Sequence, residues 1–245
     1  MRKKRSWAML SPKPWRAEAT LRFFLGVFVC MSLGILLLEG VNPMVGGPES
    51  EGGRLLQFLV NFGSIHGASL VLIHFFLKEH GMSWTHAFGF KSGKPFRCLF
   101  LGLCAGLISF PMVIGLGQFS ALCMTLIGVE PQSQQTVEVL KSTLSVTHQI
   151  VFGIMIIFVA PLAEEIIFRG ILYPLMKKNG HRYTALWGSS LLFGLIHSNV
   201  MTFVPLTLFS VFLTLLYEKT DNLTTPMVTH GVFNALNFSF LIWQQ

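Results

Sequence analysis

Two glutamates and an arginine interrupt a long apolar run, and they limit what this chain can fold into more than any other feature. The run extends from about residue 150 to residue 176 and contains Glu164, Glu165 and Arg169. A charged side chain at the depth of a membrane costs about 3 kcal/mol, so such groups are usually paired and functional. The rest of the chain therefore has to supply partners for these three residues.

The composition indicates a polytopic membrane protein. Hydrophobic residues make up 52% of the 245 residues, charged residues make up 12%, and the mean hydropathy is +0.60. A soluble chain carries about 25% charged residues. We therefore expect an all-α fold, a transmembrane helical bundle in the lipid bilayer.

The net charge of +7 reflects membrane topology and indicates no nucleic-acid partner. Seven of the 18 Lys and Arg residues lie among the first 22 residues. Lys and Arg concentrate in cytoplasmic segments beside membrane spans, so we expect a cytoplasmic N-terminus. The compact length favours an integral protein of a bacterial plasma membrane.

Apolar runs separated by charged loops predict seven spans. The third run has no charged residue and is longer than a simple span, so the count becomes eight if it divides. The polar segment 129–148 is expected outside, with a short interfacial helix. The predicted spans are 23–38, 55–77, 98–128, 150–176, 183–197, 202–217 and 226–243.

This pattern divides the chain into three parts. Residues 1–22 are expected to form a basic cytoplasmic segment, and residues 23–148 the N-terminal transmembrane helices and loops. Residues 149–245 are expected to form a core transmembrane domain that carries the polar motifs. Nothing in the sequence indicates an oligomeric state.

Counting residues along the spans brings four polar positions to one layer. Glu164 lies 13 residues before the lysine that follows its span, and His197 lies 15 residues after the arginine that precedes its span. At about 1.5 Å per residue, both lie about 20 Å from the inner end of their helix. If about 10 Å of the Glu164 helix protrudes from the membrane, Glu164 lies about 10 Å below the inner surface, and His197 lies at nearly the same level. His230 and Asn234 lie about 8 to 14 Å from the start of the last span. We expect this layer in the inner half of the membrane, open to the cytoplasm.

Helical spacing gives the two glutamates different surroundings. Glu165 and Arg169 are four residues apart, so their carboxylate and guanidinium share a helical face and can pair. Glu164 points about 100° away and is less neutralised. It is therefore the candidate general base, and His197 could share or relay its proton.

The last span adds hydrogen-bond donors to this layer. His230 and Asn234 are four residues apart, so an imidazole and a carboxamide share one face. Such groups suit a developing oxyanion. With Glu164 and His197 as bases, they form a constellation for the attack of water on a carbonyl carbon.

Each of these elements also has a structural interpretation. A Glu and Arg four residues apart often only stabilise a helix, and a lone histidine or a His and Asn pair often bridges helices. The three motifs together favour a functional site. In contrast, His66, His74 and His148 match no pattern and are interpreted as structural or interfacial.

Other intramembrane protease chemistries fit the sequence poorly. Aspartyl proteases need two aspartates and the chain has only Asp221, and it contains no His-Glu-x-x-His zinc motif. The two serines after Gly188 lack the loop pattern of a serine nucleophile. We expect no cofactor, and zinc stays an open alternative because carboxylates and imidazoles bind it. Its ligands would be Glu164, His197 and His230.

The motifs resemble the signature of the CAAX protease and bacteriocin-processing family, which includes type II CAAX prenyl endopeptidases and other glutamate-type intramembrane proteases. That signature is Glu-Glu-x-x-x-Arg, then Phe-x-x-x-His, then His-x-x-x-Asn, and this chain has all three in order. The matching residues are Glu164, Glu165, Arg169, Phe193, His197, His230 and Asn234. The resemblance extends over about residues 151–240.

The resemblance implies a helical membrane peptidase in which Glu164 and His197 activate water and His230 and Asn234 form the oxyanion hole. It implies a catalytic set of Glu164, Glu165, His197, His230 and Asn234, with Arg169 and Phe193 as structural support. Family members process prenylated CAAX tails, bacteriocin leaders or signalling peptides, and the sequence does not choose among these.

The expected function is therefore endopeptidase cleavage of a peptide or protein near the cytoplasmic membrane face. An alternative is a non-proteolytic membrane immunity or scaffold protein, in which the same polar cluster serves packing. Replacing Glu164 separates the two, because only the peptidase depends on a base at this position.

Overall fold

A computed structural model describes the chain at residues 10–41, 43, 47, 50–90, 94–141, 145–179 and 181–244. Among these residues the regular elements are all helices, which confirms the all-α prediction. The predicted orientation depends mainly on Arg2, Lys3, Lys4 and Arg5, which lie outside the described residues.

The first half of the chain follows the predicted apolar runs. Helix α1 spans Ala17–Val41, and α2 (Glu51–Phe62), the π-helix η2 (Gly63–Gly67) and α3 (Ala68–Glu79) form one rod. After α4 (Trp84–Ala87), α5 spans Pro95–Leu126. The short helix expected in the segment 129–148 is α6 (Gln135–Lys141).

The second half contains another long rod and three more helices. The rod consists of α7 (Val146–Ile154), the π-helix η3 (Met155–Val159), α8 (Ala160–Glu165), the π-helix η4 (Ile166–Leu172) and α9 (Tyr173–Asn179). The remaining helices are α10 (Arg182–Ile196), α11 (Val200–Thr220) and α12 (Thr224–Trp243).

Five helices among the described residues are long and apolar enough to cross a membrane, so the predicted count of seven or eight is not confirmed. They are Ala17–Val41, Gly52–Glu79, Pro95–Leu126, Val146–Lys178 and Val200–Thr220. Helix α10 has only 15 residues, fewer than the roughly 17 to 25 that cross a bilayer. Helix α12 has 20 residues, but its polar side chains lower its hydropathy. The third run does not divide, because α5 continues through Pro111 as one helix.

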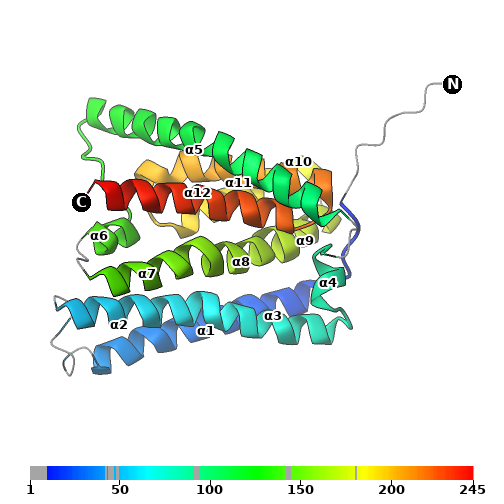
Figure 1. Cartoon of the computed structure of the whole chain (residues 1–245). Helices are drawn as coiled ribbons and strands as arrows, with labels where there is room; N and C mark the ends of the chain where they lie inside the picture. Colours follow the sequence, from blue (N-terminus) through cyan, green and yellow to red (C-terminus); the bar gives the residue numbers. More distant parts are fainter. Residues whose placement is uncertain are drawn as a thin grey trace.

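The long helices lie side by side with the α7–α9 rod in the middle (Figure 1). Helix α1 and the α2–α3 rod lie on one side of it, and α5, α10, α11 and α12 lie on the other. The first described residues and the end of α12 lie at opposite ends of the bundle. Because the middle rod carries the predicted glutamates, their partners can come from both sides.

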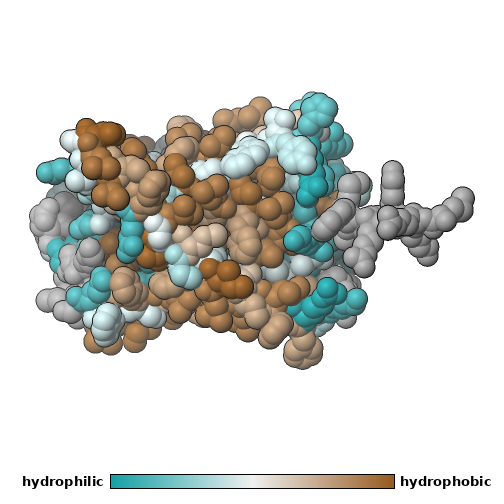
Figure 2. Space-filling model, turned by 90° about the horizontal axis from the view of Figure 1, so that it is seen from above, coloured by the Kyte–Doolittle hydropathy of each residue, from teal (hydrophilic) through white to brown (hydrophobic). Residues whose placement is uncertain are grey.

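The surface is that of an integral membrane protein. Figure 2 shows hydrophobic side chains in a broad band across the middle of the visible face, with polar residues gathered at its two ends. Large exposed apolar side chains, such as Phe28, Phe100 and Phe158, lie on α1, α5 and the middle rod. Such a belt is stable when lipid covers it.

Helices α5 and α12 cross closely because two glycines of α5 face α12. A Cβ at Gly102 would lie 2.7 Å from the Cβ of Val228, and one at Gly106 would lie 2.6 Å from the Cβ of Val232. In addition, Thr229 Oγ1 donates a hydrogen bond of 3.2 Å to the Gly102 carbonyl. Small residues four apart let membrane helices approach. The crossing fixes the height and rotation of α12.

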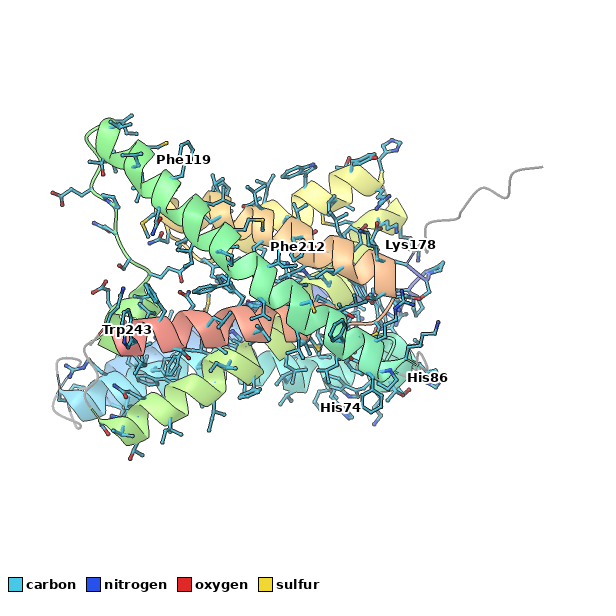
Figure 3. The ribbon with its side chains drawn as sticks, turned by 45° about the horizontal axis from the view of Figure 1, so that its top comes forward. His74, His86, Phe119, Lys178, Phe212 and Trp243 are labelled. Atoms are coloured by element: carbon cyan, nitrogen blue, oxygen red, sulfur yellow. The ribbon has the colours of Figure 1, made fainter. Side chains whose placement is uncertain are left out.

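Beyond this crossing α5 leaves the bundle. Residues 114–126 include no buried side chain, and Phe119 stands well apart from Trp243 at the end of α12 (Figure 3). Pro111 precedes this part and removes one backbone N–H from the helix. The N-terminal half of α5 therefore positions α12, and residues 114–126 bury no side chain against it.

Residues 10–16 form a strap across the N-terminal end of the bundle. Trp15 is buried, and its Nε1–H donates 2.7 Å to the carbonyl of Gly170 in η4. Ser11 Oγ donates 3.0 Å to Asp221 Oδ1 at the turn between α11 and α12. The strap therefore joins the middle rod to the α11–α12 pair.

Candidate active site

Glu164 lies near the end of α8, between η2 on one side and α12 on the other. Its Oε1 is 3.1 Å from His66 Nε2, and its Oε2 is 3.9 Å from His230 Nε2. The side chain is 15% exposed, and Oε2 has no hydrogen-bond partner among the described residues. One carboxylate oxygen is thus fixed, and the other is free to accept a hydrogen bond.

Glu165 is fully buried and is held from two sides. Arg169 Nη1 donates 2.9 Å to its Oε1, and His230 Nδ1 lies 2.9 Å from the same oxygen. The pairing of Glu165 with Arg169 predicted from their spacing is confirmed. Because an ionised carboxylate only accepts hydrogen bonds, His230 donates through Nδ1. Its Nε2 is then left on the side of Glu164.

Arg169 connects the middle rod to α10 and α11. Its Nη2 donates 3.2 Å to the Ser210 carbonyl on α11, and its guanidinium carbon lies 4.6 Å from the ring centroid of Phe193 on α10. The side chain is almost completely buried, so the charge depends on Glu165 for compensation. Of the two predicted support residues, Arg169 is one half of the ion pair and Phe193 contacts it.

His197 ends α10. Its Nδ1 donates 2.7 Å to the Phe193 carbonyl, so Nε2 is the nitrogen that carries the lone pair in the neutral form of this imidazole. The next residue, Ser198, has a φ of 50°, in the left-handed region that stops a helix. The ring of Phe193 contacts both His197 and His230, with centroid separations of 4.9 Å and 6.0 Å. His197 therefore lies beside the residues that surround the two glutamates.

Asn234 ties α12 to the middle rod by donating 2.8 Å from Nδ2 to the Ile156 carbonyl of η3. In an α-helix that carbonyl would accept from the N–H of Ala160, which here donates to Met155 instead. The following residue, Pro161, has no N–H. The Ile156 carbonyl is therefore available to Asn234, whose carboxamide has a second N–H to offer.

The three π-helical segments among the described residues all contribute to this region. Segment η2 carries His66, η3 accepts the bond from Asn234, and η4 carries Arg169. A π-turn contains an extra residue, so it redirects the side chains that follow, and it occurs frequently at functional sites. Here the π-turns place polar groups on helix faces that meet.

The predicted site residues lie together, and the structure adds His66 to them. His66 was interpreted as structural or interfacial, and this interpretation missed its contact with Glu164. A signal was present, because His66 lies 12 residues before Lys78 and Glu164 lies 13 residues before Lys177. Counting residues along each span therefore puts both at one level. In contrast, His74 is exposed.

The geometry offers no ready ligand set for zinc. Among the described residues, no group of three or more His, Cys, Asp and Glu is arranged to hold a metal ion. Glu164 and His230 approach at 3.9 Å, and the other nitrogen of His230 is occupied by Glu165. The zinc alternative at Glu164, His197 and His230 thus gains no support from the positions of these side chains.

Part of the chain is similar to known proteins. Residues 146–236 match the family model described as type II CAAX prenyl endopeptidase Rce1-like. The chain is also 34% identical over 96 residues to the uncharacterized protein YpbD of Bacillus subtilis (strain 168). The aligned segment covers 38% of this chain and 44% of that protein. The chain thus spans less than half the length of this curated relative. No solved structure matches it.

Proposed function

We propose that this chain is a membrane-embedded endopeptidase in which Glu164 activates a water molecule. The match of residues 146–236 to the Rce1-like type II CAAX prenyl endopeptidase model supports this proposal. The observation that carries this proposal is the state of the Glu164 carboxylate. Its Oε1 is held by His66, and its Oε2 has no partner among the described residues and lies on the side of His230. A carboxylate fixed in this way is suited to take a proton from water.

In the proposed reaction, water is the nucleophile. Glu164 Oε2 accepts one proton while the water oxygen forms a bond to the carbonyl carbon, and the C=O electron pair moves to the carbonyl oxygen. The C–N bond then breaks, and the amine leaves with a proton delivered through Glu164 or His197. His197 suits this relay because its Nδ1 is bound to Phe193 and its Nε2 is available.

The negative charge on the carbonyl oxygen requires donors, and α12 supplies them. Asn234 has a second N–H beside the one bound to Ile156, and doubly protonated His230 would donate through Nε2. The two residues lie one helical turn apart, so both can reach one oxygen. Glu165 and Arg169 would position His230 and would not contact the substrate.

The cleaved bond is proposed to lie near the cytoplasmic membrane face. His230 is six residues after Thr224, the first residue of α12, which places it about 9 Å from that helix end. Lys177 and Arg182 pair with Glu218 near the end of α11, shortly before α12 begins, and basic residues of this kind mark the cytoplasmic side. The substrate is proposed to be a membrane-associated peptide tail or leader.

Comparing protein termini in cells that carry the wild type or Glu164→Gln tests this function. A set of peptide termini should occur only with the wild type, while both proteins reach the membrane in equal amounts. Identical sets of termini would contradict peptidase function. The immunity or scaffold alternative would then gain if the cellular phenotype survived Glu164→Gln and was lost in Arg169→Ala through misfolding.

A further inference from the structure

The contact between His66 and Glu164 brings a helix from outside the matched family segment into the site. His66 lies on η2, whereas the family match covers residues 146–236. We propose that His66 is a positioning residue, which occupies Glu164 Oε1 so that Oε2 is the oxygen presented to the reacting water. This inference rests on the proposed function, and it assigns a role in the site to the α2–α3 rod.

The carboxylate needs such an anchor, because its own torsion does not fix it. The last torsion of a glutamate side chain is broad and roughly two-fold, so the two oxygens exchange places easily. A hydrogen bond of 3.1 Å from His66 Nε2 to Oε1 distinguishes them. A base that is already oriented avoids the cost of ordering it during the reaction.

His66 is itself held in place. Its ring stacks on that of Phe62, with the centroids 4.2 Å apart and the planes at 20°. Helix α1 packs against the same turn, since a Cβ at Gly34 would lie 2.6 Å from Ser64 Oγ. The imidazole of His66 therefore faces Glu164 while Phe62 and helix α1 hold the η2 turn in place from the other sides.

A purely space-filling role for His66 makes a different prediction. An apolar residue of similar size would then replace it at little cost. The His66→Met variant keeps the volume and removes the N–H, whereas His66→Gln places an amide N–H near the position of Nε2. The matched control is His74→Met on the same rod, because His74 is exposed and lies at the edge of the bundle (Figure 3).

The first experiment measures cleavage by the full chain in lipid vesicles, with a peptide taken from the comparison of termini. We expect His66→Met to lower kcat by about 10- to 100-fold with little change in KM, as for other residues that orient a catalytic group. His66→Gln should recover most of the rate, and His74→Met should match the wild type. Equal rates for the Met and Gln variants, or a loss confined to KM, would overturn the proposal.

The second experiment does not depend on proteolysis. Infrared difference spectra between two pH values contain a carboxyl band that Glu164→Gln removes, which assigns that band to Glu164. His66→Met should shift the band because it removes the hydrogen bond, and His74→Met should leave it in place. An unshifted band in the His66→Met protein refutes the positioning role even where cleavage is intact. A shifted band in a protein that cleaves nothing supports the contact and refutes the proposed function.

Discussion

His230 binds the carboxylate of Glu165 through a 2.9 Å hydrogen bond from Nδ1, so the buried ion pair of the middle rod also orients the imidazole of α12. The same oxygen, Oε1, accepts the bond from Arg169. Glu165 Oε1 therefore both compensates the buried charge of Arg169 and orients the imidazole of His230. This arrangement separates the two glutamates in the way that their spacing predicted.

Replacing Glu165 with Leu should lower the free energy of unfolding of the protein and abolish cleavage. It leaves the Arg169 charge buried without compensation, which typically costs about 3 to 5 kcal/mol. The double variant Glu165→Leu/Arg169→Leu should regain much of the stability, because an apolar pair of similar volume often replaces a buried ion pair. It should remain inactive, because His230 has lost its acceptor. Thermal unfolding and cleavage measure both effects, and an active double variant would contradict the orienting role.

Replacing Asn234 with Leu should lower kcat by about 100- to 1,000-fold, the usual cost of one oxyanion donor. Asn237 provides the matched control, because it lies on the same helix three residues further on and is similarly half-buried. Asn237→Leu should retain activity. Comparable losses in both variants would indicate that α12 is merely sensitive to substitution.

Replacing Gly106 with Leu should force α5 and α12 apart. Any side chain there meets Val232 and the Thr229 carbonyl, and overpacking of this kind costs about 1 to 3 kcal/mol. Because α12 carries His230, cleavage should fall together with the melting temperature. Gly115→Leu is the control, since a Cβ at Gly115 meets nothing within 4 Å. If Gly106→Leu left both quantities unchanged, the crossing would not position α12.

Treatment with a metal chelator should leave cleavage unchanged, because the proposed reaction uses only Glu164, His197, His230 and Asn234. The measurement is the cleavage rate before and after dialysis against the chelator. Activity that is lost on chelation and restored by zinc would replace this mechanism with a metal-dependent one. The three candidate ligands would then have to move closer together than the structure shows.

Replacing Pro161 with Ala should lower kcat while raising helix stability. The new N–H at position 161 can bond to a carbonyl of η3 and so compete with Asn234 for Ile156. Pro111→Ala, in a helix that does not bear site residues, is the control. A tenfold or smaller loss is expected, since Asn234 remains present. An unchanged rate would mean that the Ile156 bond does not position Asn234.

The helices and the motif residues could be predicted because their signals are local. Apolar runs and spacings of four residues are visible in the sequence, and the pairing of Glu165 with Arg169 follows directly. The number of spans was harder, because polar site residues lower the hydropathy of α12, and α10 is shorter than a bilayer is thick.

His66 and the π-turns could not be derived in the same way. The partner of His66 lies 98 residues away, and counting along a helix gives the level of a residue but not the direction it faces. Segment η3 has a local cause in the sequence, the missing N–H of Pro161. The sequence around η2 contains no proline that would explain it in the same way.

The bond from Asn234 to the Ile156 carbonyl also couples the movements of two helices. If α12 slid by one turn, about 5.4 Å, that carbonyl would lose its bond to Asn234, which contributes about 1 kcal/mol. Any opening that admits a substrate should therefore carry α12 and the middle rod together. The hinge would lie in their neighbours, and the base and the oxyanion donors would travel as one rigid unit.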